Sequence, residues 1–427
     1  LVNSSKYDDQ LRLAWQSFTC NDIPSNNGNC DGNNAIGKFS GTHKANFGTW
    51  VSKLKTGTSP GTTNTPSHMV VWNAGEYLKT TGSNSPWNAN PGTTDNNPLT
   101  CRRAYHIFLT DGGWNYSNPS TYYPSNPPSK AGAADGFSFN TKIKTTDPLA
   151  QAMQNADGKA TTFPDGTDYT VTSTNVQTQV YRDAYGADRI IKNASDKIEY
   201  AYPSLADMAF YYWATDLQQG ISDGVIKKIR KSGQETFTST LPNGTQKSVA
   251  IDEYWNPKNN PATWQHLVQY TIGYGSAASN LKQLVATSPQ FTGGTYGMYN
   301  SGFSDLITGK TTWDDPTSTA ADASYDNYRP QEMWHMAINS RGKFYPVSGG
   351  DLTSVFSDIF DDIIVDTTAP ITGFTSASGS VSRVGTQSYQ TSYTSADDAN
   401  TNDDRWYGHV TSDSISTSGS TSPNPDW

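Results

Sequence analysis

Long apolar runs and a surplus of positive charge are both missing from this sequence. No stretch of about 18 apolar residues occurs, so we predict no membrane-spanning helix. The 30 Lys and Arg residues are outnumbered by 39 Asp and Glu, which gives a net charge of −9. This balance argues against a nucleic-acid-binding protein, which needs a basic face to contact the phosphates, and it disfavours electrostatic docking on an anionic membrane.

Cysteine is also scarce, with three residues in the chain. Cys20 and Cys30 bracket a short polar loop, and a disulfide between them is expected in an oxidising compartment. Two free surface thiols are the alternative. Cys101 is left over, either buried and unpaired or with a partner outside this chain.

Catalytic signatures are absent as well. The six histidines form no His-Glu-x-x-His motif, and there is no Gly-x-Ser-x-Gly elbow, phosphate-cradling loop or zinc-type Cys/His cluster. His106 and His266 fall within apolar stretches that predict strands, where a structural histidine is the simpler interpretation. We therefore expect a protein that is not an enzyme, and a secreted hydrolase is the least favoured class.

What the sequence does contain is aromatic and polar. Charged residues make up only 16%, against roughly 25% in an average soluble domain. Ser, Thr, Asn and Gly supply the polarity, as is typical of an extracellular protein. The 12 Trp, 24 Tyr and 15 Phe residues predict that most of the 427-residue chain folds. This length allows two or three domains.

The first part of the chain alternates between helical and strand patterns. The period of apolar residues predicts a strand at Leu11–Phe18 and helices at Asn46–Leu54 and Ser67–Thr80. Tyr105–Thr110 is a short apolar run that ends in a turn at Asp111, which indicates a buried strand. Such alternation predicts an α/β fold with a doubly wound sheet.

The regular pattern lapses and then returns. Residues 112–262 are predicted to form a mixed α+β insertion. Its expected elements are a β-like stretch at Tyr169–Tyr185, an apolar helix at Leu205–Leu217 whose Tyr211, Tyr212 and Trp213 we expect in the core, and a hairpin at Thr236–Ile251 that turns at Asn243-Gly244. After it we predict a strand within Thr263–Gly273, a helix at Arg329–Asn339, a strand at Lys343–Val347 and an amphipathic helix at Asp351–Ile364. The predicted organisation is a first part of the α/β domain at 1–111, the insertion at 112–262, the second part of the α/β domain at 263–365 and a β-rich region at 366–427.

Two polar residues stand where an α/β sheet binds ligands. Asp111 follows the carboxyl end of a predicted parallel strand, and Thr65 precedes a predicted helix. A carboxylate and a hydroxyl there can converge on Mg²⁺ or Ca²⁺. Taken singly, Asp111 reads more simply as a turn residue and Thr65 as a helix cap.

Several stretches resemble one family in the same order along most of the chain. They are NTPSHMVVWNAGEYL (Asn64–Leu78), CRRAYHIFLTDGGWN (Cys101–Asn115), LADMAFYYWATDLQ (Leu205–Gln218), PATWQHLVQYTIGYG (Pro261–Gly275), GKFYPVSGGDLTSVFSDIFDDI (Gly342–Ile363) and DDRWYGHV (Asp403–Val410). Together they are similar to the von Willebrand A-like region of the PilY/PilC family of type IV pilus-associated adhesins. The last stretch resembles the start of that family's C-terminal β-propeller.

The resemblance implies a metal-ion-dependent adhesion site in which Thr65 and Asp111 supply two of the ligand loops for Mg²⁺ or Ca²⁺. The family's first-strand Asp-x-Ser-x-Ser motif is not found in this chain. Asn3, Ser4 and Ser5 come nearest, but no Asp stands at the right spacing. We expect that the chain is processed or truncated and that this motif lies upstream of Leu1.

The function implied by the resemblance is non-enzymatic. It is that of an adhesin and assembly factor at a pilus tip, exported through the periplasm to the cell surface, with minor pilins and a host-cell or abiotic surface receptor as partners. The alternative is a secreted von Willebrand A-type protein that binds matrix or glycans and has no link to pili. In the sequence itself, the Pro-interrupted aromatic residues Trp114, Tyr116, Tyr122 and Tyr123 are candidates for partner contact. The acidic residues Asp397, Asp398, Asp403 and Asp404 are interpreted as a solvated linker rather than a Ca²⁺ loop.

Overall fold

A computed structural model describes most of the chain, in two compact units at Leu1–Ile364 and Val365–Trp427. Each unit is treated by itself. The described residues are 5–18, 23, 34–54, 67–94, 97–110, 148–154, 156–172, 174–183, 189–192, 198–275, 301–313, 325–347, 352–367, 375–378, 386–394, 407–415 and 421–423.

The first unit is organised around a parallel sheet. Its described strands lie in the order β11 (Phe344–Val347), β10 (Leu267–Tyr274) and β3 (Ala104–Thr110), and both outer strands run parallel to β10. In the register of β3 and β10, Tyr105 lies opposite Val268. The strands before and after the predicted insertion therefore pair directly, although the whole of residues 112–262 separates them. The predicted strands at these positions are confirmed.

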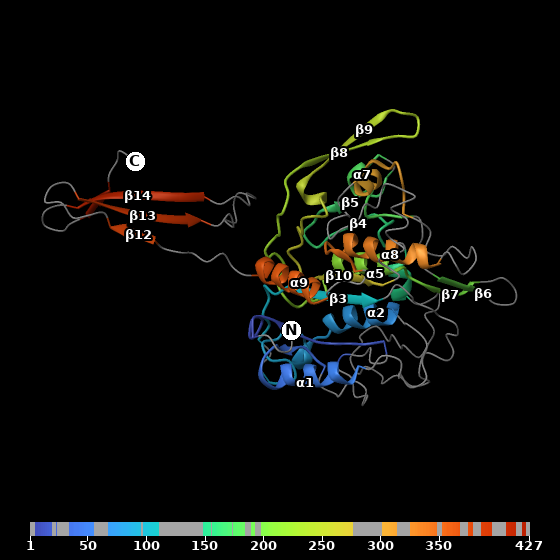
Figure 1. Cartoon of the computed structure of the whole chain (residues 1–427), viewed down its shortest axis with the longest axis horizontal. Coiled ribbons are helices and arrows are strands. Elements are labelled where there is room, and N and C mark those ends of the chain that lie inside the picture. Colours follow the sequence, from blue (N-terminus) through green and yellow to red (C-terminus); the bar gives the residue numbers. More distant parts are fainter. Residues whose placement is uncertain are drawn as a thin grey trace. The chain divides into compact units, whose positions relative to one another are not determined.

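Helices α5 (Leu205–Ala214) and α8 (Tyr325–Asn339) cover one face of this sheet (Figure 1). Leu267 and Phe108 of the strands join the apolar core on this side. The hydroxyl of Thr271 donates to the carbonyl of Met333 at 2.9 Å, which ties β10 to α8. Helix α2 (Ser67–Leu78) packs beside α5 and contacts β3.

The other face of the sheet has its own core. The alternate residues of β10, which are Val268, Tyr270 and Ile272, pack there with side chains from helix α9 (Leu352–Thr367) and from the N-terminal segment. Successive side chains of a strand point to opposite faces, and the intervening residues Gln269 and Thr271 are fully buried as well, so β10 is covered on both sides. The first unit is therefore a mixed α/β structure with a parallel sheet. The finer prediction of a von Willebrand A fold remains a prediction.

Helix α5 comes from the predicted insertion, yet it is central to this core. Ser204 caps the helix by accepting a hydrogen bond from the amide of Asp207 at 3.0 Å. Tyr212 and Trp213 are fully buried, as the sequence predicted, while Tyr211 is half-buried. The middle of the chain thus shares one apolar core with the helices that flank the sheet.

Two-stranded ribbons and several further helices also belong to the described part of the first unit. The predicted hairpin is confirmed as β8 (Glu235–Thr240) paired with β9 (Gln246–Ile251). The predicted strand at Leu11–Phe18 was too long, because the strand that the structure describes there is β1 (Arg12–Leu13), which pairs with β2 (Gly37–Lys38). Helix α1 (Gly41–Lys53) begins five residues before the predicted start.

Two further ribbons are β4 (Thr161–Thr162) with β5 (Asp168–Tyr169), and β6 (Arg189–Lys192) with β7 (Ile198–Tyr202). Helix α7 (Ser301–Thr308) contacts β8.

The second unit is an antiparallel meander. Its strands are β12 (Thr375–Ser378), β13 (Thr386–Thr394), β14 (Tyr407–Ile415) and β15 (Thr421–Pro423), in that order across the sheet. β-structure was predicted here. Within the described residues of both units, every helix is too short or too polar to cross a bilayer.

Candidate functional site

Most site residues predicted from the sequence lie outside the described residues. Strand β3 ends at Thr110, directly before Asp111, and α2 begins at Ser67, two residues after Thr65. Neither Asp111 nor Thr65 is itself described, so their convergence on Mg²⁺ or Ca²⁺ stays a prediction. The same holds for the Cys20 and Cys30 pair, and for the aromatic and acidic candidates Trp114, Tyr116, Tyr122, Tyr123, Asp397, Asp398, Asp403 and Asp404. Cys101 is described, and its thiol is free and exposed, which removes the alternative that it is buried.

The structure instead brings together three ligand-type side chains that the sequence analysis missed. Asp157 follows helix α4 (Pro148–Met153), Asp183 lies shortly after the 3₁₀ turn η2 (Val176–Thr178), and His335 projects from the middle of α8. One potential ligand atom from each lies within 4.8 Å of the others. All three side chains are at most 2% exposed. We call these residues the buried triad.

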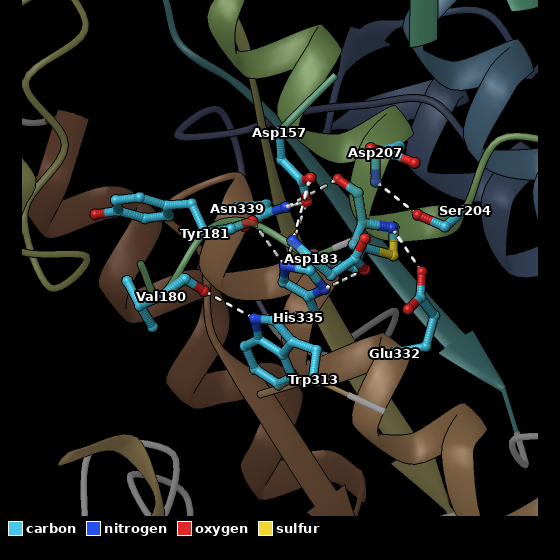
Figure 2. A network of polar contacts seen from close by, with 12 residues as sticks. Asp157, Val180, Tyr181, Asp183, Ser204, Asp207, Trp313, Glu332, His335 and Asn339 are labelled. Carbon is cyan, nitrogen blue, oxygen red and sulfur yellow. Dashed lines mark hydrogen bonds and ion pairs between the residues drawn. The ribbon is translucent and has the colours of Figure 1, made fainter. Parts of the chain in front are cut away.

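The imidazole of His335 is placed between the two carboxylates (Figure 2). Its Nε2 lies 3.4 Å from Oδ2 of Asp157, and its Nδ1 lies 3.6 Å from Oδ2 of Asp183. Nε2 is also 2.8 Å from the backbone carbonyl of Tyr181. Because a carbonyl can only accept, Nε2 carries the proton and donates it there. In the neutral ring, Nδ1 is then an unprotonated acceptor directed at a carboxylate.

Neighbouring side chains hold the triad in this arrangement. The amide of Asn339 donates to Oδ2 of Asp157 at 2.9 Å. The ring of Trp313 stacks on the imidazole of His335, with 4.2 Å between centroids and 14° between planes. The indole Nε1 of Trp313 donates to the carbonyl of Val180 at 2.9 Å, and this carbonyl precedes Tyr181 in the chain. The imidazole therefore has one defined orientation.

Burial dominates the electrostatics of this region. It raises the pKa of Asp157 well above its ordinary value, and the nearby charges of Asp207 and Asp183 raise it further. Burial also lowers the pKa of His335 well below 6.5. The nearby guanidinium of Arg341, stacked on the rings of Tyr181 and Trp213, has its pKa lowered to about 9 by the same burial.

The arrangement suits a ligand cluster better than a catalytic group. A general acid or base must reach a substrate, and these side chains are closed off from solvent. Two carboxylates and an imidazole are, in contrast, an ordinary ligand set for a divalent ion. Asp157, Asp183 and His335 share no short motif, so no sequence pattern indicates that they meet.

His106 and His266, the two histidines predicted to be structural, both have such partners. His106 on β3 contacts the side-chain oxygen of Gln269 through Nδ1 at 3.0 Å, across the strand pair. His266, just before β10, accepts from the amide of Asn260 through Nε2 at 2.8 Å and donates from Nδ1 to the carbonyl of Trp264 at 2.7 Å. This fixes the neutral tautomer of His266.

The neutral state of His266 gives the fold a predictable sensitivity to acid. Burial lowers its pKa to about 3, and the nearby charge of Arg103 lowers it as well. Below pH 6.5 the unfolded chain takes up a proton that the folded chain refuses, so stability falls as the pH falls toward 3. His266→Gln removes this term. We expect its unfolding free energy to decline less steeply than that of the wild type between pH 6 and 4, by about 1.4 kcal/mol per pH unit.

Urea unfolding at several pH values measures this slope. Thr271→Val is the matched control, since Thr271 is equally buried but does not titrate. It should lower stability at every pH without changing the slope. Equal slopes for His266→Gln and the wild type would show that His266 is protonated in the folded state.

Comparison with the sequences of known proteins places this chain in a family. The chain is 32% identical over 358 residues to the type IV pilus biogenesis factor PilY1 of Pseudomonas aeruginosa strain PAK, an alignment that covers 83% of this chain and 23% of that protein. The protein of the same name from strain UCBPP-PA14 is 30% identical over 410 residues, which is 94% of this chain and 27% of that protein. No family model matches the chain. No solved structure matches it either.

The aligned chain consists of a mixed α/β region built on a parallel sheet, followed along the sequence by an antiparallel β unit. The chain is of the PilY1 type, as its motifs predicted from the resemblance to the PilY/PilC family. It spans about a quarter of the length of the curated relatives that it matches.

Proposed function

We propose that this chain is part of a type IV pilus biogenesis factor that acts without catalysis as an adhesin at the pilus tip. The observation that carries the proposal is the similarity to PilY1 along 83–94% of the chain. It would work at the cell surface, with minor pilins and a surface or host-cell receptor as its partners.

The fold supports a binding role of this kind. In open α/β sheets, ligands bind beyond the carboxyl ends of the strands. Asp111 directly follows the carboxyl end of β3, a strand that pairs in parallel with β10. A von Willebrand A-type sheet with Thr65 and Asp111 at this edge would present an Mg²⁺- or Ca²⁺-dependent adhesion site. Recognition would then come from loops on a rigid scaffold, with no bond broken.

Genetic complementation tests the proposal. In the bacterium that encodes this chain, deletion of its gene is expected to abolish surface pili seen by electron microscopy, and the wild-type gene is expected to restore them. Asp111→Ala should restore pili but reduce attachment to the level of wild-type cells treated with a chelator. Asp358→Ala is the control, since Asp358 is an exposed acid on α9. Normal piliation in the deletion strain would refute the assembly role, and normal attachment by Asp111→Ala would refute the adhesion site.

A further inference from the structure

The buried triad has an electrostatic mismatch that a bound cation would resolve. In the neutral ring of His335, Nε2 donates to the carbonyl of Tyr181, and Nδ1 turns its lone pair toward Oδ2 of Asp183 at 3.6 Å. No hydrogen-bond donor reaches this Nδ1 among the described residues, although the side chain is 1% exposed. A lone pair facing a carboxylate is unfavourable unless a positive charge lies between them.

Among the described residues, no cationic side chain supplies that charge to Nδ1 of His335. Arg341 is the nearby buried cation, and its guanidinium stacks on aromatic rings instead of joining a described ion pair with the triad.

A divalent cation fits both the charge and the hydrogen bonds. Ionised Asp157 and Asp183 with a neutral His335 carry a charge of −2, which one divalent ion neutralises. A ligating histidine characteristically donates its second ring N–H to a carbonyl, as Nε2 does here to Tyr181. Asn339 donates to Asp157, as the outer partner of a ligating carboxylate does.

The chemistry of the ligands selects the class of ion. Ca²⁺ and Mg²⁺ take oxygen ligands, whereas an imidazole with carboxylates suits Zn²⁺ or Mn²⁺. We propose that Asp157, Asp183 and Nδ1 of His335 bind one divalent transition-metal ion. The site is closed, so the ion is structural and is taken up as the chain folds. It joins the 157–183 segment to α8, and thereby to the face of the sheet that α8 covers. The proposal does not depend on the pilus function.

Metal analysis of the whole chain tests this directly. The protein is unfolded in chelator, refolded with Zn²⁺ or Mn²⁺, dialysed, and its metal content measured by mass spectrometry. We expect about one equivalent in the wild type and at least a roughly tenfold loss in Asp183→Asn and His335→Gln. His266→Gln is the matched control, since it removes an equally buried imidazole outside the triad and should retain the ion. A wild type that holds no metal after this refolding, or a control that loses as much as the triad variants, overturns the proposal.

The sign of the change in melting temperature gives a second readout, which remains usable if one of the other variants fails to fold. Asp157→Asn keeps the shape of the side chain and removes one of the mutually repelling buried carboxylates. In chelator it should therefore raise the melting temperature above that of the wild type. With Zn²⁺ or Mn²⁺ it should instead lower it, because a ligand is lost, whereas Ca²⁺ should have no such effect. The same shift in chelator and in metal would show that the triad binds no ion.

Discussion

Replacing Gly342 by alanine is expected to lower the unfolding free energy by about 4 kcal/mol or more. A Cβ at this position would lie 2.0 Å from the carbonyl oxygen of Gln269 and 2.7 Å from its carbonyl carbon. These are backbone atoms of β10, which pairs with a strand on each side and cannot move aside locally. The substitution would therefore have to separate the end of α8 from the sheet.

The local backbone explains why a glycine is needed there. The chain leaves α8 through Arg341, whose φ of 63° is left-handed, and the amide of Gly342 then donates to the carbonyl of Ala337 at 2.8 Å. This closing bond is that of a Schellman motif. It directs the chain straight from α8 into β11, against the back of β10. The close approach is thus set by the helix end and by the sheet together.

Urea unfolding of purified Gly342→Ala and Gly220→Ala measures the effect. Gly220 has an ordinary φ and nothing within 4 Å of an added Cβ, so its substitution should change stability by no more than about 0.5 kcal/mol. If Gly342→Ala does not fold, soluble yield beside the Gly220→Ala control serves as the readout. A loss of less than about 1 kcal/mol in Gly342→Ala would show that α8 and β10 are not this close.

Gly75→Ala is the second substitution with a large expected effect, a loss of about 2–3 kcal/mol. Gly75 lies within α2, and three atoms of the Tyr212 ring would be 2.2–2.4 Å from its added Cβ. The hydroxyl of Tyr212 holds the ring across α2 by contacting Oε1 of Glu76 at 3.0 Å and the carbonyl of Trp72 at 3.3 Å. Alanine is favoured over glycine in a helix by about 1 kcal/mol, which offsets only part of the overpacking.

A double-mutant cycle isolates the cause. In a Tyr212→Leu background the ring is gone, so Gly75→Ala should become neutral or slightly stabilising through its helix propensity. The free energies come from denaturant unfolding of the four proteins. A loss that persists without the ring would locate the strain elsewhere in α2.

Where the prediction from the sequence was wrong, hydrogen bonds from nearby side chains to the backbone decided the local structure. The stretch Tyr169–Tyr185 was predicted to be β-like. In the structure β5 ends at Tyr169, and the chain continues into the 3₁₀ turn η2. The hydroxyl of Thr172 accepts from the amide of Asn175 at 3.1 Å, and the Asn175 side chain donates to the carbonyl of Thr170 at 2.9 Å. Such side-chain bonds to the nearby backbone compete with a strand ladder.

The sequence by itself determined the elements whose pattern is set by residues a few positions apart. The run at β3, the helical period of α2 and α9, and the Asn243-Gly244 turn between β8 and β9 each carry their own local signal. The resemblance of several such stretches, in order, was enough to identify the family. These features depend on neighbours a few residues apart, so a single sequence contains them.

Only the tertiary structure decided which distant residues meet. It paired β3 with β10, placed α5 from the middle of the chain in the core beside α8, and closed Asp157 and Asp183 around His335. The members of the triad lie up to 178 positions apart (335 − 157) and share no motif. Their approach results from packing the segments that follow α4 and η2 against α8, and that packing leaves no periodic trace in the sequence.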